Sequence, residues 1–156
     1  VDRTFVLSGQ ERHIYNARFG NNGYPARAMY TEKYVYIRNL QVKRWPSGLP
    51  KRYADIDDGS RSKTTVIEGN YENPEFFAKL IFDKRPAEEL YYIKDDPDQL
   101  INLVGDPKHT SQLEKLRQLM DAQLTASKDP RTRGDGKEFE LVPYHSPDLN
   151  QETFVE

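Results

Sequence analysis

The sequence predicts an α+β fold, with a small antiparallel sheet of about four strands packed by one long C-terminal helix and one short helix. Three observations support this prediction. Four short segments are rich in β-branched and aromatic residues and are bounded by turn-forming residues. Leucines recur at helical spacing in one long segment after residue 106. No apolar period persists between residues 41 and 73, so we expect a long loop there.

The expected strands are residues 4–7, 26–30, 34–40 and 90–93. A polar loop follows the first, and a glycine- and asparagine-rich turn at 20–23 leads into the second. Only three residues separate the second strand from the third, in which β-branched and aromatic side chains dominate. These two segments therefore predict a β-hairpin.

Two segments predict helices. Pro74 and the apolar residues that follow it indicate a short amphipathic helix that ends before Pro86. The pair Asp106-Pro107 is typical of a helix start, because aspartate caps the free backbone N–H groups and proline suits the first turn. The long helix that follows should end at Asp129-Pro130. One stripe of it carries Leu113, Leu116, Met120 and Leu124, with Leu119 beside it.

The 156 residues suit one domain, which we place at residues 1–130, followed by an extended tail at 131–156. The core is expected to be thin, since little more than a fifth of the residues are Leu, Ile, Val or Phe and the mean hydropathy is -0.89. Aromatic residues nevertheless reach 12%. A thin, aromatic-rich core and a first residue other than methionine suggest a fragment that packs against something larger.

Charge and cysteine content exclude several classes of function. Lys and Arg number 23 against 25 Asp and Glu, so the basic excess that binds nucleic-acid backbones is absent. With no cysteine there is no disulfide, thiolate metal site or cysteine nucleophile. No apolar run approaches the length of a membrane-spanning helix.

Three motifs in the sequence have simpler explanations than the functions they suggest. Asp55, Asp57, Asp58 and Gly59 invite a calcium-loop interpretation, but the spacing is wrong and a solvated acidic turn is favoured. Residues 35–40 match one strand motif of RNA-recognition modules, yet the companion motif is absent. The three histidines are too scattered to predict a metal site.

The best candidate site is the polar loop after the first strand, which begins Glu11-Arg12-His13. Loops at strand ends often carry functional groups. Arginine can donate two parallel hydrogen bonds to a sulfate, phosphate or carboxylate, and histidine can donate or accept near neutral pH. A free-standing carbohydrate-binding or interaction module is the alternative, with Trp45 as its best anchor; a Trp buried between domains is the competing explanation for that residue.

Two long segments of the sequence carry a resemblance to a known family. Residues 84–103, KRPAEELYYIKDDPDQLINL, and the following GDPKHTSQLEKLRQLMDAQL resemble the C-terminal part of the formylglycine-dependent sulfatases, an alkaline-phosphatase-like family. Residues 11–39, ERHIYNARFGNNGYPARAMYTEKYVYIRN, are similar to the sulfamidase-like branch. The two matches occur in the family's order and together cover residues 5 to about 131.

The resemblance implies a large catalytic α/β domain and a smaller C-terminal domain with a four-stranded antiparallel sheet and a packed helix. In the family, a C/S-x-P-x-R signature provides formylglycine, and a calcium ion is bound beside it. This chain has no cysteine and no S-x-P-x-R sequence, so its residues should supply neither group and the chain alone should be inactive. Both are expected in a missing N-terminal catalytic domain of the same polypeptide.

The same resemblance implies a role for the polar loop. The intact enzyme would hydrolyse a sulfuric ester or a sulfamate, of a glycosaminoglycan or other sugar or of an aryl group. His13 first, then Arg12 and Glu11, are the candidate substrate contacts, as part of a pocket that this domain completes. The family's locations imply a periplasmic, secreted or lysosomal-like setting.

Overall fold

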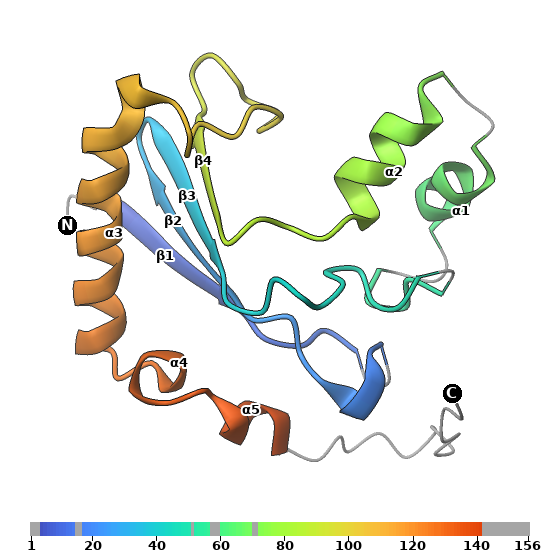
Figure 1. The fold of residues 1–156 in the computed structure, drawn as a ribbon, viewed down its shortest axis with the longest axis horizontal. Coiled ribbons are helices and arrows are strands. Elements are labelled where there is room, and N and C mark those ends of the chain that lie inside the picture. Colours follow the sequence, from blue (N-terminus) through green and yellow to red (C-terminus); the bar gives the residue numbers. More distant parts are fainter. Residues whose placement is uncertain (1–3, 15–16, 51, 57–59, 70–71, 142–156) are drawn as a thin grey trace.

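The computed structural model describes residues 4–14, 17–50, 52–56, 60–69 and 72–141. Its centre is one antiparallel sheet in the order β1-β2-β3-β4 (Figure 1). The strands are β1 (Phe5–Gln10), β2 (Ala26–Thr31), β3 (Tyr34–Asn39) and β4 (Glu88–Tyr92). The predicted α+β class and the predicted hairpin, now β2 and β3, are both confirmed.

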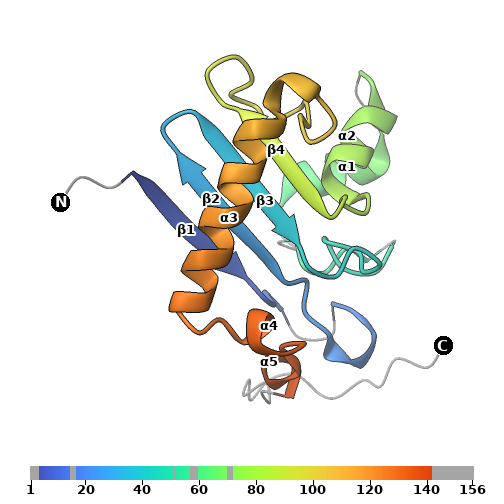
Figure 2. The same cartoon turned by 60° about the vertical axis from the view of Figure 1, so that its left-hand side comes forward.

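The long helix α3 (Thr110–Ala126) lies across one face of the sheet (Figure 2). Side chains alternate between the two faces of each strand, and Met29, Tyr36 and Leu90 point toward the helix, where all three are fully buried. The predicted leucine and methionine stripe of α3 packs on them. A 3₁₀ turn, η2 (Pro107–His109), precedes α3, and the carboxylate of Asp106 caps it by accepting from the backbone N–H of Lys108 at 2.9 Å.

The first strand is longer than the sequence predicts. It continues past residue 7 because Ser8 and Gly9 pair with Ala28 and Arg27 of β2. A Cβ atom on Gly9 would lie 3.2 Å from Cδ of Arg27, so glycine lets the Arg27 side chain cross the strand. The polar loop consequently starts at Glu11.

Short helices line the opposite side of the sheet from α3 (Figure 1). The predicted helix after residue 73 is α2 (Pro74–Phe82). The long loop before it also contains a helix that the sequence did not predict, α1 (Arg61–Glu68). Ser60 caps its start by accepting from the Lys63 N–H, and Gly69 ends it with a left-handed φ of 67°.

Residues after α3 form two further short helices, α4 (Pro130–Arg133) and α5 (Lys137–Leu141). They occupy the described part of the predicted tail, where the expected extended conformation is replaced by these two helical turns. Residues 142–156 of the tail lie outside the described structure. A short 3₁₀ turn, η1 (Phe19–Asn21), lies in the loop between β1 and β2. Among the described helices, none has the length and apolar content that crossing a bilayer requires.

Candidate functional site

The polar loop begins with Glu11, whose carboxylate bridges two arginines. Oε1 accepts from Arg27 at 2.6 Å, and Oε2 accepts from Arg131 of α4 at 2.6 Å. Both guanidinium groups are almost fully buried, whereas the Glu11 side chain is 21% exposed. Glu11 therefore fastens the start of the loop to the sheet and to the chain that follows α3.

The two arginines belong to a larger cluster of ion pairs, here called the Glu11 cluster: Glu11, Arg27, Asp129, Arg131, Glu140 and Arg44. Arg27 also donates from Nε to Asp129 at 2.7 Å, and Arg131 approaches Glu140 at 3.3 Å. Burial works against the charged form of Arg27, but its bonds to Asp129 and Glu11 outweigh that effect and raise its pKa. The cluster thus holds full charges on side chains that are mostly buried.

The next two residues of the loop differ in their surroundings. Arg12 donates to the backbone oxygen of Asn21 at 3.1 Å and so spans the loop. His13 is exposed, and its Nδ1 lies 3.1 Å from the backbone oxygen of Asp55. A carbonyl oxygen only accepts, so Nδ1 carries the proton in this bond, and Nε2 makes no hydrogen bond with a described residue.

Asp55 organises this part of the surface. One carboxylate oxygen accepts from the Ile14 N–H at 3.1 Å, and the other accepts from Arg18 at 2.5 Å in an ion pair whose side chains are 1% and 4% exposed. Arg18 also donates to the backbone oxygens of Trp45 and Pro46. The β1–β2 loop is thereby tied to the loop after β3, and the orientation of the His13 ring depends on that link.

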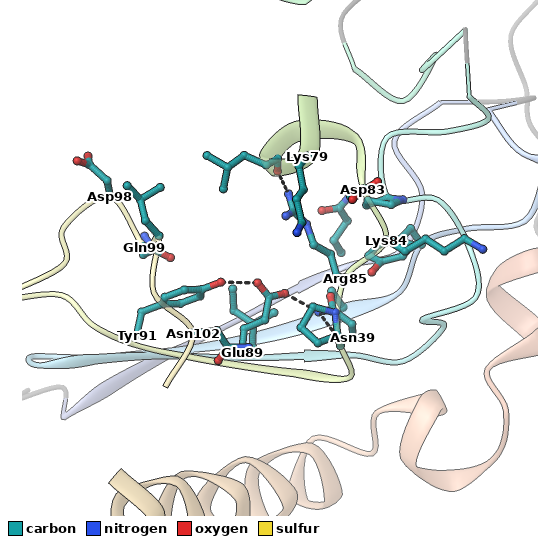
Figure 3. A pocket seen from close by; sticks show the side chains of 18 of the residues that line it. Asn39, Lys79, Asp83, Lys84, Arg85, Glu89, Tyr91, Asp98, Gln99 and Asn102 are labelled. Atoms are coloured by element: carbon teal, nitrogen blue, oxygen red, sulfur yellow. Dashed lines mark hydrogen bonds between the residues drawn. The ribbon is translucent and has the colours of Figure 1, made fainter. Parts of the chain in front are cut away.

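A cavity of about 850 Å³, here called the sheet cavity, adjoins this link on the face of the sheet turned away from α3 (Figure 3). Pro46, whose carbonyl binds Arg18, lines it. Its floor carries Asn39 and Glu89 from β3 and β4. The opposite wall comes from the end of α2 and the residues after it, and the far rim from the turn after β4 (Figure 3). Charged side chains of this wall and rim are Lys79, Asp83, Lys84, Arg85 and Asp98.

The side chains on the floor of the sheet cavity are buried and hydrogen-bonded to one another. Glu89 is 7% exposed and accepts from Asn39 at 2.6 Å and from the Tyr91 hydroxyl at 2.5 Å. Burial, and then the bond to Glu89, raise the pKa of Tyr91. Burial likewise raises the pKa of Tyr24, another lining residue, to about 12, with the charge of Glu89 adding to the shift. Both tyrosines therefore remain protonated, and each presents a hydroxyl rather than a charge at neutral pH.

The alternatives left open by the sequence can be placed in the structure. Tyr36, the strand aromatic that an RNA-recognition sheet would expose, is fully buried under α3. Lys84 lies with its Nζ 5.0 Å from the centre of the Trp45 ring, so one side of that ring is already covered by a cation. Asp55 is paired with Arg18, while residues 57–59 of the acidic turn lie outside the described structure. Within the described ranges, no group of three His, Cys, Asp or Glu residues could hold a metal ion.

Comparison with known proteins decides the family. No family model matches the chain. A curated protein from Formosa agariphila, described as an ulvan-active sulfatase, is 31% identical to it over 122 residues, which cover 75% of this chain. The chain belongs to the sulfatase family. The resemblance to the sulfatases seen in the sequence is thereby confirmed.

The match covers only 19% of the Formosa protein, so this chain spans about a fifth of its relative's length, as expected for the family's C-terminal domain. Two solved structures are also similar. One, from Bacteroides thetaiotaomicron VPI-5482 and described as a candidate sulfatase, is 22% identical, with a TM-score of 0.47, and the match covers 94% of this chain and 20% of that one. The other, described as a 2-O GAG sulfatase, is 21% identical, with a TM-score of 0.49 and coverages of 86% and 19%.

Sequence reasoning placed the three candidate residues on one loop, and the structure shows that their side chains are used differently. Both carboxylate oxygens of Glu11 are occupied by arginines, Arg12 bonds within the loop, and Nε2 of the exposed His13 makes no hydrogen bond with a described residue. Asp55, Arg18 and the floor of the sheet cavity were not predicted. Only the density of charged residues after residue 10 and at 55–58 gave any signal for them.

Proposed function

We propose that this chain is the C-terminal domain of a sulfatase and completes its substrate pocket, while the reactive groups lie on other parts of the parent polypeptide. The observation that carries this proposal is the match itself, which covers three quarters of this chain and a fifth of a sulfatase. The parent would hydrolyse a sulfuric ester or sulfamate. Formylglycine and calcium would belong to its catalytic lobe, because this chain lacks the sequence signature for the first.

The unpartnered side of the sheet supports a large neighbouring lobe. Val6 and Tyr30 pair across β1 and β2 and point away from α3, and they are 51% and 43% exposed. On the same side, α2 exposes Phe76 and Phe77. Large apolar side chains exposed together on one side are typical of a surface that another domain covers. We propose that the catalytic lobe of the parent packs there.

Within that pocket, His13 is the proposed substrate contact. Its Nδ1–H is held by the backbone oxygen of Asp55, and Nε2 of this exposed side chain makes no hydrogen bond with a described residue. A protonated ring would donate from Nε2 to a sulfate oxygen, and a neutral ring would accept from a sugar hydroxyl. Glu11 acts differently, because its carboxylate is held by two arginines and sets the position of the loop.

The substrate class follows from the relative, which acts on ulvan by its description. We propose a sulfated polysaccharide as the substrate of the parent enzyme. The test is the kinetics of the parent carrying His13→Ala, with ulvan oligosaccharides and 4-nitrophenyl sulfate as substrates. A hydrogen bond to a charged group contributes about 1.5 kcal/mol, which corresponds to about a tenfold change in rate. For a substrate that contacts His13, kcat/KM of the His13→Ala variant should therefore fall about tenfold.

The control variant is Lys115→Ala, an exposed position on α3. It should leave both kcat/KM and the melting temperature unchanged. His13→Ala should also leave the melting temperature unchanged, because the residue is exposed and makes one hydrogen bond with a described residue. A lower melting temperature with unchanged kinetics per folded molecule would show that His13 is structural and would contradict the proposed contact.

A further inference from the structure

A second hollow, of about 530 Å³, lies at the other end of the sheet from the polar loop. Two tyrosines, Tyr34 of β3 and Tyr92 of β4, and His109 of η2 form its aromatic part. We call these three residues, with the polar residues Lys33, Asp95 and Gln112 at the rim, the tyrosine hollow. Strand register places it far from His13, because β1 ends beside residue 26 whereas Lys33 lies in the turn after β2.

The aromatic rings are held rigidly and form a shaped surface. Tyr34 and Tyr92 are directly paired across β3 and β4, and their ring centres lie 5.0 Å apart at an angle of 49°. His109 meets the Tyr34 ring edge-on at 5.9 Å, and its Nδ1 lies 3.3 Å from the Tyr34 hydroxyl. Thr31 fixes the turn beside them by accepting from the Tyr34 N–H at 2.9 Å.

One wall of the hollow is also fixed by hydrogen bonds. The carboxylate of Asp96 accepts from the backbone N–H groups of Leu100 and Ile101, each at 2.9 Å. Ile101 lines the hollow and is nevertheless 64% exposed. The hollow is therefore preformed, and a ligand would not bear the cost of ordering it.

The rim groups have no partner among the described residues. The side chains of Lys33, Asp95 and Gln112, and the hydroxyl of Tyr92, make no hydrogen bond or ion pair there. They offer an ammonium group, a carboxylate, an amide and a hydroxyl around two tilted tyrosine rings. This contrasts with the polar loop, where most of the charged groups are paired.

Such an arrangement suits a sugar ring. A pyranose has faces of C–H groups that pack on aromatic rings, and a rim of hydroxyls that both donate and accept hydrogen bonds. One positive and one negative rim group give no basic patch for a nucleic acid. We propose that the tyrosine hollow binds one sugar ring of a polysaccharide chain, at a site separate from the polar loop. This inference does not depend on the parent being a sulfatase.

The test is affinity electrophoresis of the purified chain in gels that contain one polysaccharide each. Dextran and agarose serve as neutral polymers, and dextran sulfate and κ-carrageenan as sulfated ones, so the panel separates recognition of the ring from recognition of sulfate. We expect at least one polymer to retard the protein. Tyr92→Ala should then lower the affinity at least tenfold, and Asp95→Ala should lower it severalfold.

Two controls keep the result interpretable. Asp95 is exposed and makes no side-chain bond with a described residue, so its variant tests the hollow even if Tyr92→Ala fails to fold. Trp45→Ala changes an aromatic residue outside the hollow and should bind as the unaltered chain does. The proposal is overturned if none of the four polymers retards the protein, if neither hollow variant weakens binding, or if Trp45→Ala alone removes it.

Discussion

Replacing Glu11 by glutamine tests whether the Glu11 cluster holds the polar loop. Removing one member of a buried ion pair costs about 3–5 kcal/mol, because the other charge stays buried without its partner. Here the cost should be smaller. Arg27 keeps Asp129 at 2.7 Å, Arg131 keeps the backbone oxygen of Asp135 at 2.5 Å, and Glu11 itself is 21% exposed. We expect the free energy of unfolding to fall by about 2 kcal/mol.

Urea unfolding at pH 7 measures this change. The free energy of unfolding of a small protein falls by about 2 kcal/mol per molar urea, so the urea concentration at the unfolding midpoint should fall by about 1 M. A double-mutant cycle of Glu11→Gln with Arg131→Met should show a coupling of about 1–2 kcal/mol. The control cycle uses Arg133→Met, because Arg133 is exposed and makes no ion pair with a described residue. A change below about 0.5 kcal/mol, or equal coupling in the two cycles, would refute the reasoning.

Three further predictions concern the core, the pH dependence of stability and the loop backbone. Leu116→Ala, at a position only 2% exposed, should lower the free energy of unfolding in urea by about 2–5 kcal/mol, whereas Gln118→Ala on the exposed side of α3 should change it little. The bond from Arg117 lowers the pKa of Glu88, so folding favours its ionised form. That contribution is present above the unfolded pKa of about 4.5 and is lost as the pH falls through the folded value. The melting temperature of Glu88→Gln should therefore fall less steeply than that of the unaltered protein as the pH drops from about 5 to 3, and identical slopes would contradict this. Gly23→Ala would place a Cβ 2.5 Å from the backbone oxygen of Glu11, which accepts from the Tyr24 N–H, and should lower the melting temperature by several degrees. Gly105→Ala meets nothing within 4 Å and is its control, so equal melting temperatures for these two variants would contradict the clash.

Much of the fold was predictable because local signals agreed with the final packing. The stripe from Leu113 to Leu124 is the apolar face of its helix, and it packs on Met29, Tyr36 and Leu90 of the sheet. Helix α1 was missed because four consecutive β-branched residues, 64–67, favour a strand locally. Its end signals, Ser60 and Gly69, were present in the sequence, but they stand within a segment that is otherwise rich in loop residues.

The candidate site was less predictable, because its partners are distant in sequence. The sequence placed Glu11, Arg12 and His13 on one loop because they are neighbours in the chain. The residues that fix the loop come from β2 and from α4, and Arg131 is 120 positions away from Glu11. Glu89 and Asn39 lie within strands, where their side chains could belong to either face until the register is known. Such pairings follow from tertiary structure and leave no local pattern in the sequence.

The most direct test of the central claim is mass spectrometry of the native protein, captured from its source with an antibody raised against this chain. The account predicts a polypeptide several times larger than 18.2 kDa that contains a C/S-x-P-x-R peptide with its first residue converted to formylglycine. A native polypeptide of 18.2 kDa without that peptide would contradict the claim that the reactive groups lie on another lobe.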